Sequence, residues 1–490
     1  MAEGATRQIA EWSSTLGYAD IPARLHDKTK AQILSVLGAV HAGRHSEGAM
    51  SGAEVARSWG GPGESTVFVG GDKLPRHNAI FANTIASVAF DFDDYLCFGH
   101  TGHSAVCAAF AYGELEGASG KDVLTAITVG NEVGGRLGGA LLLGPQNGQM
   151  WSYIHLLEGA CVAGRFVGLD AGRMANAIGV AFTQPPYPLM PAFMGPDSKL
   201  MIPASTTIDG CRAAELAARG WTGNQSILED RQGFLRRFNE QNFGWMLTGL
   251  GEAWVTDSLC YKVVPGCAYI DTAVDAFTEI SRRFEADNGR RPAPEDVGEI
   301  TVRCGLLTSG MEGFAQTYRS AERLEPISIN FSVALSFGVM LNAGALGPEF
   351  LSHKYLDANR EAIEAVAAKV QMSHDAEMDK RAGEIGERGS VSVRSLLGGQ
   401  TLAGRSFEDY VMTFPTEVTL RTTAGAEYTE LQDIPLGGAG RPWDETTALV
   451  REKFLTNFSG DESRGKDALD AVQRIEELDD VRELTALLTG

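Results

Sequence analysis

A short segment of the chain, DFDDYLCFGHTGH, combines carboxylate and imidazole side chains between two Ala-rich apolar stretches. It supplies three carboxylates, Asp91, Asp93 and Asp94, and two histidines, His100 and His103. An imidazole can change its charge near neutral pH and a carboxylate can orient it, so these residue types suit general acid/base chemistry. The alternative interpretation is a solvated loop whose aspartates cap the ends of helices. The segment alone leaves both interpretations open.

Composition and charge exclude several classes of protein. The 490 residues are 44% hydrophobic and 21% charged, with ample length for two or three domains. The net charge of −21 argues against nucleic acid or an anionic membrane surface as a partner. The seven cysteines are scattered and lack CxxC spacing, which indicates reduced thiols rather than disulfides or a zinc site. Because there is no signal core and no run of about 18 apolar residues, we expect a cytoplasmic protein without membrane contact.

From about residue 20 to 260 the apolar residues recur with the helical period. Ser119 and Asp122 have capping-box spacing at the start of one predicted helix, in which Glu132 and Arg136 are four residues apart. A glycine-rich run at 134–147 is better explained by close helix packing than by a phosphate loop, because no strand precedes it and no GK[ST] follows. Small-residue faces of this kind indicate tightly packed helices, which we predict at 21–43, 119–143, 159–182 and 204–219.

The pattern changes after about residue 260. Alternating β-branched residues predict strands at 299–309 and 410–431, the second stretch containing a turn at Ala424 and Gly425. Between these stretches the helical period predicts helices at 272–287, 333–344 and 358–370.

The helical period returns from Trp443 to the end of the chain, interrupted by a predicted solvated loop at 459–467. We expect this last segment to rejoin the early helices. The sequence therefore predicts a mainly α protein with a large, discontinuous all-helical domain, residues 1–260 and 443–490, and a smaller α+β domain, residues 261–442.

Several longer motifs stand in order along the chain, among them AIFANTIASVAFDFDD, HTGHSAVCAAFA, SGKDVLTAITVGNEVGGRL, RFVGLDAGRMANAIGVAFTQ, DGCRAAELAARGWTG with LEDRQGF, and YKVVPGCAYIDTAVDA. With these motifs the chain resembles the MmgE/PrpD family from about residue 5 to 458. That family includes 2-methylcitrate dehydratase, cis-aconitate decarboxylase and iminodisuccinate epimerase. The resemblance implies a helical domain, an α+β lid, an active site in the cleft between them and a homodimer. It implies no metal and no organic cofactor.

The resemblance carries four candidate catalytic residues onto this chain. The aspartate that begins the family's DFDD motif is Asp91. The histidine of the family's HPG loop is His100, with one residue deleted between the two positions. The family's two functional lysines are Lys199, before a small-residue helix, and Lys262, before a Pro-x-Cys element.

The chain departs from the family pattern at several positions. Tyr95 replaces a threonine and Phe331 replaces a tyrosine. A family histidine falls near Met150, where the nearest imidazole is His155, and the histidine that follows Pro-x-Cys is absent from residues 267–269. We assign Tyr95, His155 and Phe331 to substrate binding. Two aromatic walls suggest a substrate that is less charged than a tricarboxylate and carries an aromatic or alkyl group.

The family's reactions share the handling of negative charge at a carbon next to a carboxylate. Two fixed ammonium groups, Lys199 and Lys262, would stabilise an enolate-like intermediate in a cleft with little water. His100 is the expected acid/base group, because its ordinary pKa is about 6.5. Asp91 is expected to orient His100 or to bond a substrate hydroxyl. The other polar residues of the segment are expected to be structural: Asp93, Asp94 and His103.

We therefore predict a cofactor-independent lyase that acts on a small carboxylate by dehydration-type or decarboxylation-type chemistry at the α and β carbons. One alternative is an epimerase, isomerase or cyclase of specialised metabolism, which would use the same α-proton chemistry. A further alternative is a non-catalytic homologue that keeps the fold. Retention of the four candidate residues favours an enzyme, whereas the lost histidine and tyrosine argue against ordinary dehydration. Apolar small-residue helices predict a homodimer in each case.

Overall fold

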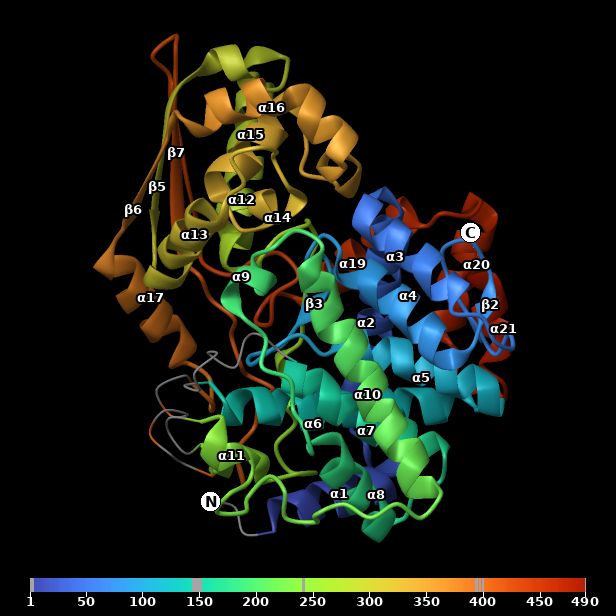
Figure 1. Cartoon of the computed structure of the whole chain (residues 1–490). Coiled ribbons are helices and arrows are strands. Elements are labelled where there is room, and N and C mark those ends of the chain that lie inside the picture. Colours follow the sequence, from blue (N-terminus) through green and yellow to red (C-terminus); the bar gives the residue numbers. More distant parts are fainter. Residues whose placement is uncertain are drawn as a thin grey trace.

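The computed structural model of the chain describes residues 4–142, 152–239, 243–392, 395, 398 and 401–489. Helices dominate these residues, and the largest sheet has four strands, all from the second half of the chain. Figure 1 shows this sheet at one edge of the molecule, with helices of the same region on one side of it and the early helices beyond them. The predicted mainly α class is confirmed. None of the described helices has the length and apolar character needed to span a bilayer.

The helical period of the first half corresponds to the helices that form. The prediction at 159–182 gives two helices, separated at Gly168, which has a φ of 70°. The helices are α1 (Ala5–Thr15), α2 (Ala23–Ala42), α3 (Glu47–Ser58), α4 (Arg76–Val88), α5 (Gly102–Glu116), α6 (Gly120–Ala140), α7 (Ser152–Phe166), α8 (Ala171–Ala181), and the later α9 (Met190–Phe193), α10 (Met201–Ala218) and α11 (Phe234–Arg237). A short hairpin, β1 (Ser65–Thr66) with β2 (Lys73–Leu74), precedes α4.

The start of α6 has the predicted capping box. The Asp122 N–H donates to Ser119 Oγ at 3.3 Å, and the Ser119 N–H donates to Asp122 Oδ2 at 3.2 Å. Further along the helix, Arg136 and Glu132 form a fully buried ion pair at 3.3 Å. The capping residues fix where this helix begins, and its buried pair is enclosed by residues 246–256, whose backbone carbonyls accept from Arg136.

Glycines allow the helices of the first half to approach very closely. A Cβ atom at Gly159 of α7 would lie 2.3 Å from the carbonyl oxygen of Thr207, and one at Gly210 of α10 would lie 2.2 Å from that of Leu156. Real Cβ atoms do not approach so closely, so only glycine fits at these two crossings. Close packing therefore explains the described part of the glycine-rich run as well, while residues 143–147 of that run lie outside the described residues.

Gly138 of α6 allows the helix to touch the backbone of the loop that leads to His100. A Cβ atom there would lie 1.9 Å from the carbonyl oxygen of Phe98. We expect Gly138→Ala to lower the free energy of unfolding by about 1–3 kcal/mol, the usual cost of overpacking. The control is Gly172→Ala on the exposed face of α8, which should raise it by about 0.4–1 kcal/mol. Denaturant titration measures both changes, and equal shifts of the two midpoints would contradict the packing argument.

A four-stranded sheet organises the second half in the order β6-β5-β7-β8, with β5 and β6 parallel and the other pairs antiparallel. Its strands are β5 (Val297–Cys304), β6 (Val370–His374), β7 (Thr416–Thr422) and β8 (Glu427–Gln432). The helices of this region are α12 (Asp271–Asn288), α13 (Leu306–Tyr318), α14 (Pro326–Asn330), α15 (Val333–Ala343), α16 (His353–Ala367) and α17 (Ala376–Gly386). The predicted hairpin and the three predicted helices are confirmed, and Gly425 supplies the turn with a φ of 89°.

Three parts of the sequence predictions for this region are wrong. Residues 410–415 are not part of a strand, because β7 begins at Thr416. Residues 305–309 are not part of a strand, because α13 begins at Leu306, whose N–H donates to Asp379 Oδ1 at 2.8 Å. The strand β6 was not predicted, and the helix expected at 358–370 ends before it. β6 lies at the edge of the sheet and is largely exposed, so it lacks the apolar alternation that marks a half-buried strand.

The C-terminal helices are α19 (Trp443–Asn457), α20 (Glu462–Gln473) and α21 (Arg482–Leu487). The loop predicted at 459–467 is wrong beyond its first residues, because α20 begins at Glu462 with Asp461 Oδ1 accepting from the Arg464 N–H at 2.9 Å. α19 packs along α2, which agrees with the expected return of the chain to the early helices. The division into a discontinuous helical domain and a lid stays a proposal.

Candidate active site

Two very short strands bring distant parts of the chain together at the loop between α4 and α5. β3 (Asp94–Tyr95) pairs antiparallel with β4 (Cys260–Tyr261), and Asp94 stands opposite Tyr261. Lys262 follows β4 directly, and its backbone N–H donates to the carbonyl oxygen of Asp93 at 3.3 Å. This pairing places a lysine from the middle of the chain beside the aspartates of the loop.

The carboxylate of Asp91 lies between the two predicted lysines. Lys199 Nζ is 2.9 Å from Asp91 Oδ1, and Lys262 Nζ is 3.5 Å from the same oxygen. Lys262 Nζ also donates to the carbonyl oxygen of Asp91 at 2.7 Å. Asp91 has a φ of 53°, and among the described residues no other non-glycine residue has a positive φ. Strained backbone of this kind is held by surrounding contacts and is found often at functional sites.

Burial and charge oppose each other in this group. Burial raises the pKa of the Asp91 carboxyl, but the ammonium groups of Lys199 and Lys262 outweigh it and hold that pKa below its ordinary value. Burial lowers the pKa of Lys262, but Asp91 and Asp93 raise it above its ordinary value. Asp91 and Lys262 therefore stay charged at neutral pH. Two ammonium groups directed at one oxygen can stabilise negative charge that develops on a substrate.

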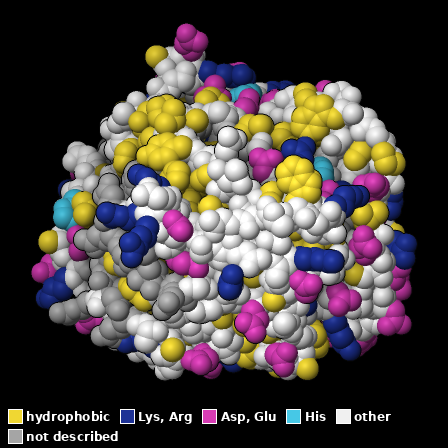
Figure 2. Space-filling model, turned by 60° about the horizontal axis from the view of Figure 1, so that its bottom comes forward, with side chains coloured by type: hydrophobic (Ala, Val, Ile, Leu, Met, Phe, Trp, Pro, Cys, Tyr) yellow, Lys and Arg dark blue, Asp and Glu magenta, His cyan; other side chains and the backbone are white. Residues whose placement is uncertain are grey.

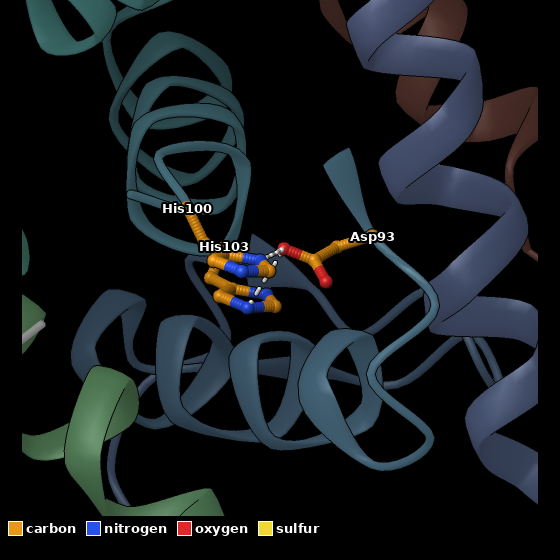
Figure 3. A group of neighbouring side chains, drawn as sticks. All are labelled: Asp93, His100 and His103. Atoms are coloured by element: carbon orange, nitrogen blue, oxygen red, sulfur yellow. Dashed lines mark hydrogen bonds and ion pairs between the residues drawn. The ribbon is translucent and has the colours of Figure 1, made fainter. Parts of the chain in front are cut away.

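A second group, shown in Figure 3, places Asp93 beside two histidines. Asp93 Oδ2 is 2.8 Å from His100 Nδ1 and 2.9 Å from His103 Nε2. His103 Nδ1 lies 3.0 Å from Ser87 Oγ on α4, and all three charged or titratable side chains are buried. The contact with Asp93 favours the tautomer of His100 in which Nδ1 carries the proton and Nε2 is the basic nitrogen.

The structure corrects the roles expected for the aspartates. Asp93 is a hydrogen-bond partner that orients His100, the role expected of Asp91, and Asp93 does not cap α5. Burial lowers the pKa of His100, and Asp93 opposes that effect. Asp94 does have the structural surroundings that were expected, since its Oδ2 accepts from Gln32 at 2.7 Å. Asp91 and Asp93 are also joined through Lys262, whose Nζ is 3.6 Å from Asp93 Oδ1.

Two of the residues assigned to substrate binding line the lysines. Lys199 Nζ lies 4.7 Å from the centre of the Phe331 ring and 5.3 Å from that of Phe193. Lys262 Nζ lies 5.9 Å from the centre of the Tyr95 ring. Aromatic faces attract cations, so these rings hold the ammonium groups in an apolar surrounding. One buried cluster contains the four catalytic candidates. Lys199 and Lys262 contact Asp91, and His100 joins them through Asp93, which lies beside Lys262.

His155, the third residue assigned to substrate binding, lies behind this cluster on α7. Its Nδ1 is 2.7 Å from Ser104 Oγ, and its ring centre is 5.9 Å from that of His103. Burial holds the pKa of His155 well below its ordinary value, so the ring is neutral. Its contacts are therefore with Ser104 and His103 rather than with the lysines, and its role in binding stays a prediction. The family position near Met150 lies outside the described residues.

Asp93, His100 and His103 also offer ligand atoms of the kinds that bind metals, all within 4.8 Å of one another. Sequence spacing did not reveal this group. A divalent cation there would lie close to the Lys262 ammonium, which is 3.6 Å from Asp93 Oδ1, and would displace both histidine contacts with Asp93. Because like charges repel strongly in a buried site, the residues fit a proton better than a metal ion.

Activity is therefore expected to survive exhaustive chelation and to need no added cofactor. The measurement is the initial rate before and after treatment with a chelator, with metal content determined on the same samples. A loss of rate that a divalent ion restores would contradict this prediction.

Sequence reasoning gave Asp93 the wrong role and did not single out Phe193 or Lys453, a buried lysine near the cluster. A signal for Lys453 exists in the sequence. Lys453 lies on the same helical face as Val450, Phe454 and Asn457, and a lysine on a buried face is rare unless its ammonium group has partners. No comparable signal marks Phe193, because the four-residue helix α9 that ends with it is too short to show a periodic pattern.

Comparisons with known proteins agree with the motifs. The sequence pattern of the MmgE/PrpD N-terminal domain matches residues 7–245. A cis-aconitate decarboxylase of Aspergillus terreus is 26% identical, over 99% of this chain and 96% of that protein. The cis-aconitate decarboxylase of Homo sapiens is 22% identical, over 100% of this chain and 95% of that protein. That of Mus musculus is also 22% identical, over 94% of this chain and 89% of that protein. The chain is a divergent member of the MmgE/PrpD family.

Proposed function

We propose that this protein is a cofactor-independent lyase that acts on a small carboxylate, with decarboxylation as its favoured reaction. The observation that carries the proposal is the convergence of Lys199 and Lys262 on one oxygen of Asp91, beside the His100–Asp93 pair. The relatives named cis-aconitate decarboxylase give the reaction class.

The proposed residues divide the chemistry between charge and proton transfer. When the bond between a carbon and a carboxylate breaks, CO2 leaves and the electron pair remains, delocalised onto a neighbouring carboxylate. Lys199 and Lys262 stabilise that negative charge. His100 moves the proton at Nε2. In decarboxylation its protonated form donates a proton to the carbon that CO2 has left and is reprotonated from solvent, whereas in isomerisation its neutral form accepts a proton from a carbon next to a carboxylate and returns it. Asp93 keeps His100 in the required tautomer.

A specific observation supports an isomerase as the second candidate. Phe331 lies 4.7 Å from Lys199 Nζ at a position where the family has a tyrosine, so the site lacks one hydroxyl donor. Proton removal and return at a carbon next to a carboxylate needs only the basic imidazole and the two lysines. This reaction would leave all carbon atoms of the substrate in place.

We also propose that residues 261–442 act as a lid. Lys262 and Phe331 come from this part of the chain, whereas Asp91, His100 and Lys199 come from residues 1–260, between the early helices. Their contacts close the cluster against water, which strengthens its electrostatic interactions. Opening between the two parts would admit the substrate.

The test incubates the protein with cis-aconitate and with smaller unsaturated and branched dicarboxylates in D2O. Proton NMR follows the substrates, and a coupled assay follows CO2. Release of CO2 supports the lyase. Deuterium incorporation without release of CO2 supports the isomerase. Binding without either change would support the non-catalytic alternative and contradict both proposals.

The proposed homodimer rests on exposed apolar side chains. Tyr187, Leu189 and Met201 flank Lys199 in sequence and are half exposed or more, as are Leu306 and Leu307 of α13. Figure 2 shows hydrophobic side chains gathered in groups on one face of the molecule. A second copy covering such surface would remove apolar area from water. Light scattering at micromolar concentration is expected to give the mass of two chains, and the mass of one chain would contradict this prediction.

A further inference from the structure

We infer that Lys453 is a positioning residue that holds both backbone segments of the site in register. Its ammonium group is buried and comes from α19. This helix is distant in sequence from the loop and the strand that carry the other site residues. Lys453 Nζ donates to the carbonyl oxygen of Lys262 at 2.9 Å and to that of Phe92. Its third partner is Ser35 Oγ of α2, at 2.9 Å.

The two carbonyl groups belong to the two halves of the site. Phe92 stands between Asp91 and Asp93, and Lys262 supplies one of the two ammonium groups that contact Asp91. A single ammonium group therefore joins the aspartate loop to the segment after β4. The ring of Phe92 adds a further contact, since its centre is 4.0 Å from Lys453 Nζ. All three donor hydrogens of the ammonium have an acceptor in this arrangement.

Burying the charged group of Lys453 costs free energy, which a side chain with only a packing role would not require. Among the described residues no carboxylate oxygen lies within ion-pair distance of its Nζ. The negative charges that act on it at longer range include Asp93 and Asp94, and burial nevertheless lowers its pKa to about 7. An apolar side chain of similar length would fill the same space without the desolvation penalty of a buried cation. The two hydrogen bonds from Lys453 to the carbonyl groups of Phe92 and Lys262 offset this desolvation penalty.

This inference rests on the proposed function, because positioning has an effect on rate only if the cluster is catalytic. The test compares Lys453→Met with a matched control, Lys28→Met. Lys28 is a largely buried lysine of α2 that donates to the backbone carbonyl of Asp257, outside the cluster. Both variants keep an unbranched side chain, one atom shorter than lysine, and remove one ammonium group.

Two readouts are measured on each variant, kcat and KM for the substrate found above, and backbone hydrogen exchange by mass spectrometry. Lys453→Met is expected to lower kcat by about tenfold to a hundredfold, because small displacements of reacting groups have effects of that size. KM should change far less. Exchange should become faster in peptides that cover residues 91–95 and 260–263. The Lys28→Met variant should show neither the loss of kcat nor faster exchange in those peptides.

A Lys453→Met variant with the kcat and the exchange pattern of the control would overturn the inference. Equal changes of kcat in both variants would also overturn it, because the effect would then be general. If the unaltered protein turns over none of the tested carboxylates, the proposed reaction fails by itself. The exchange measurement then still decides whether Lys453 holds the two segments together.

Discussion

Turnover by the Lys199→Ala and Lys262→Ala variants is expected to fall by about 10²–10³, the loss seen when one preorganised donor to developing negative charge is removed. The reason is geometric. Both ammonium groups approach the same oxygen of Asp91, at 2.9 Å and 3.5 Å, in a buried site where charge interactions are strong. Each variant would leave a single ammonium group to stabilise the negative charge formed in the reaction. Initial rates at saturating substrate measure the loss.

The matched control for these variants is Lys380→Ala. Lys380 lies on α17 with 64% of its side chain exposed and pairs only with a neighbouring glutamate at 3.5 Å. It should keep full activity, because an exposed pair contributes little and lies outside the cluster. Full activity in both Lys199→Ala and Lys262→Ala would remove the basis of the proposed function.

His100→Gln should lower turnover by about 10²–10⁴, the usual contribution of general acid/base catalysis. His353→Gln is the control, because His353 is a partly buried histidine that pairs with Glu325 at 2.7 Å, outside the cluster. A loss of the same size in both variants would show that removing any partly buried imidazole has this effect. It would contradict the assignment of His100 as the acid/base group.

The pH profile gives an independent check on Asp93. Burial lowers the pKa of His100, so the basic form that removes a proton from carbon persists below the ordinary pKa of about 6.5, and the rate of that step, followed by deuterium incorporation, should fall only as the pH drops through the lowered value. The Asp93 carboxylate raises that pKa against the effect of burial. Asp93→Asn removes this contribution, so the acid side of its profile should move to lower pH. An unchanged profile, or a shift to higher pH, would contradict the role given to Asp93.

The sequence predicted the parts of the molecule that depend on local patterns. The helical period placed α2, α6, α10 and α12, and the spacing of Ser119 and Asp122 marked the beginning of α6. These features depend on neighbours three or four residues apart, so the order of residues suffices. Errors occurred where the local pattern was weak, as in the exposed edge strand β6, or where a side chain from elsewhere caps a helix, as Asp379 does for α13.

The sequence, through its family motifs, also named the four candidate catalytic residues, but it did not determine which of their atoms meet. Those contacts depend on the pairing of β3 with β4, which joins segments about 165 residues apart in a register that no local pattern reveals. Because of that register, Lys262 reaches Asp91. The path of the loop between α4 and α5 makes Asp93 a partner of His100. The packing of α19 on α2 similarly places Lys453 against both segments. Residue types therefore follow from the sequence, whereas hydrogen-bond partners, burial and the resulting pKa values are set only when distant segments pack together.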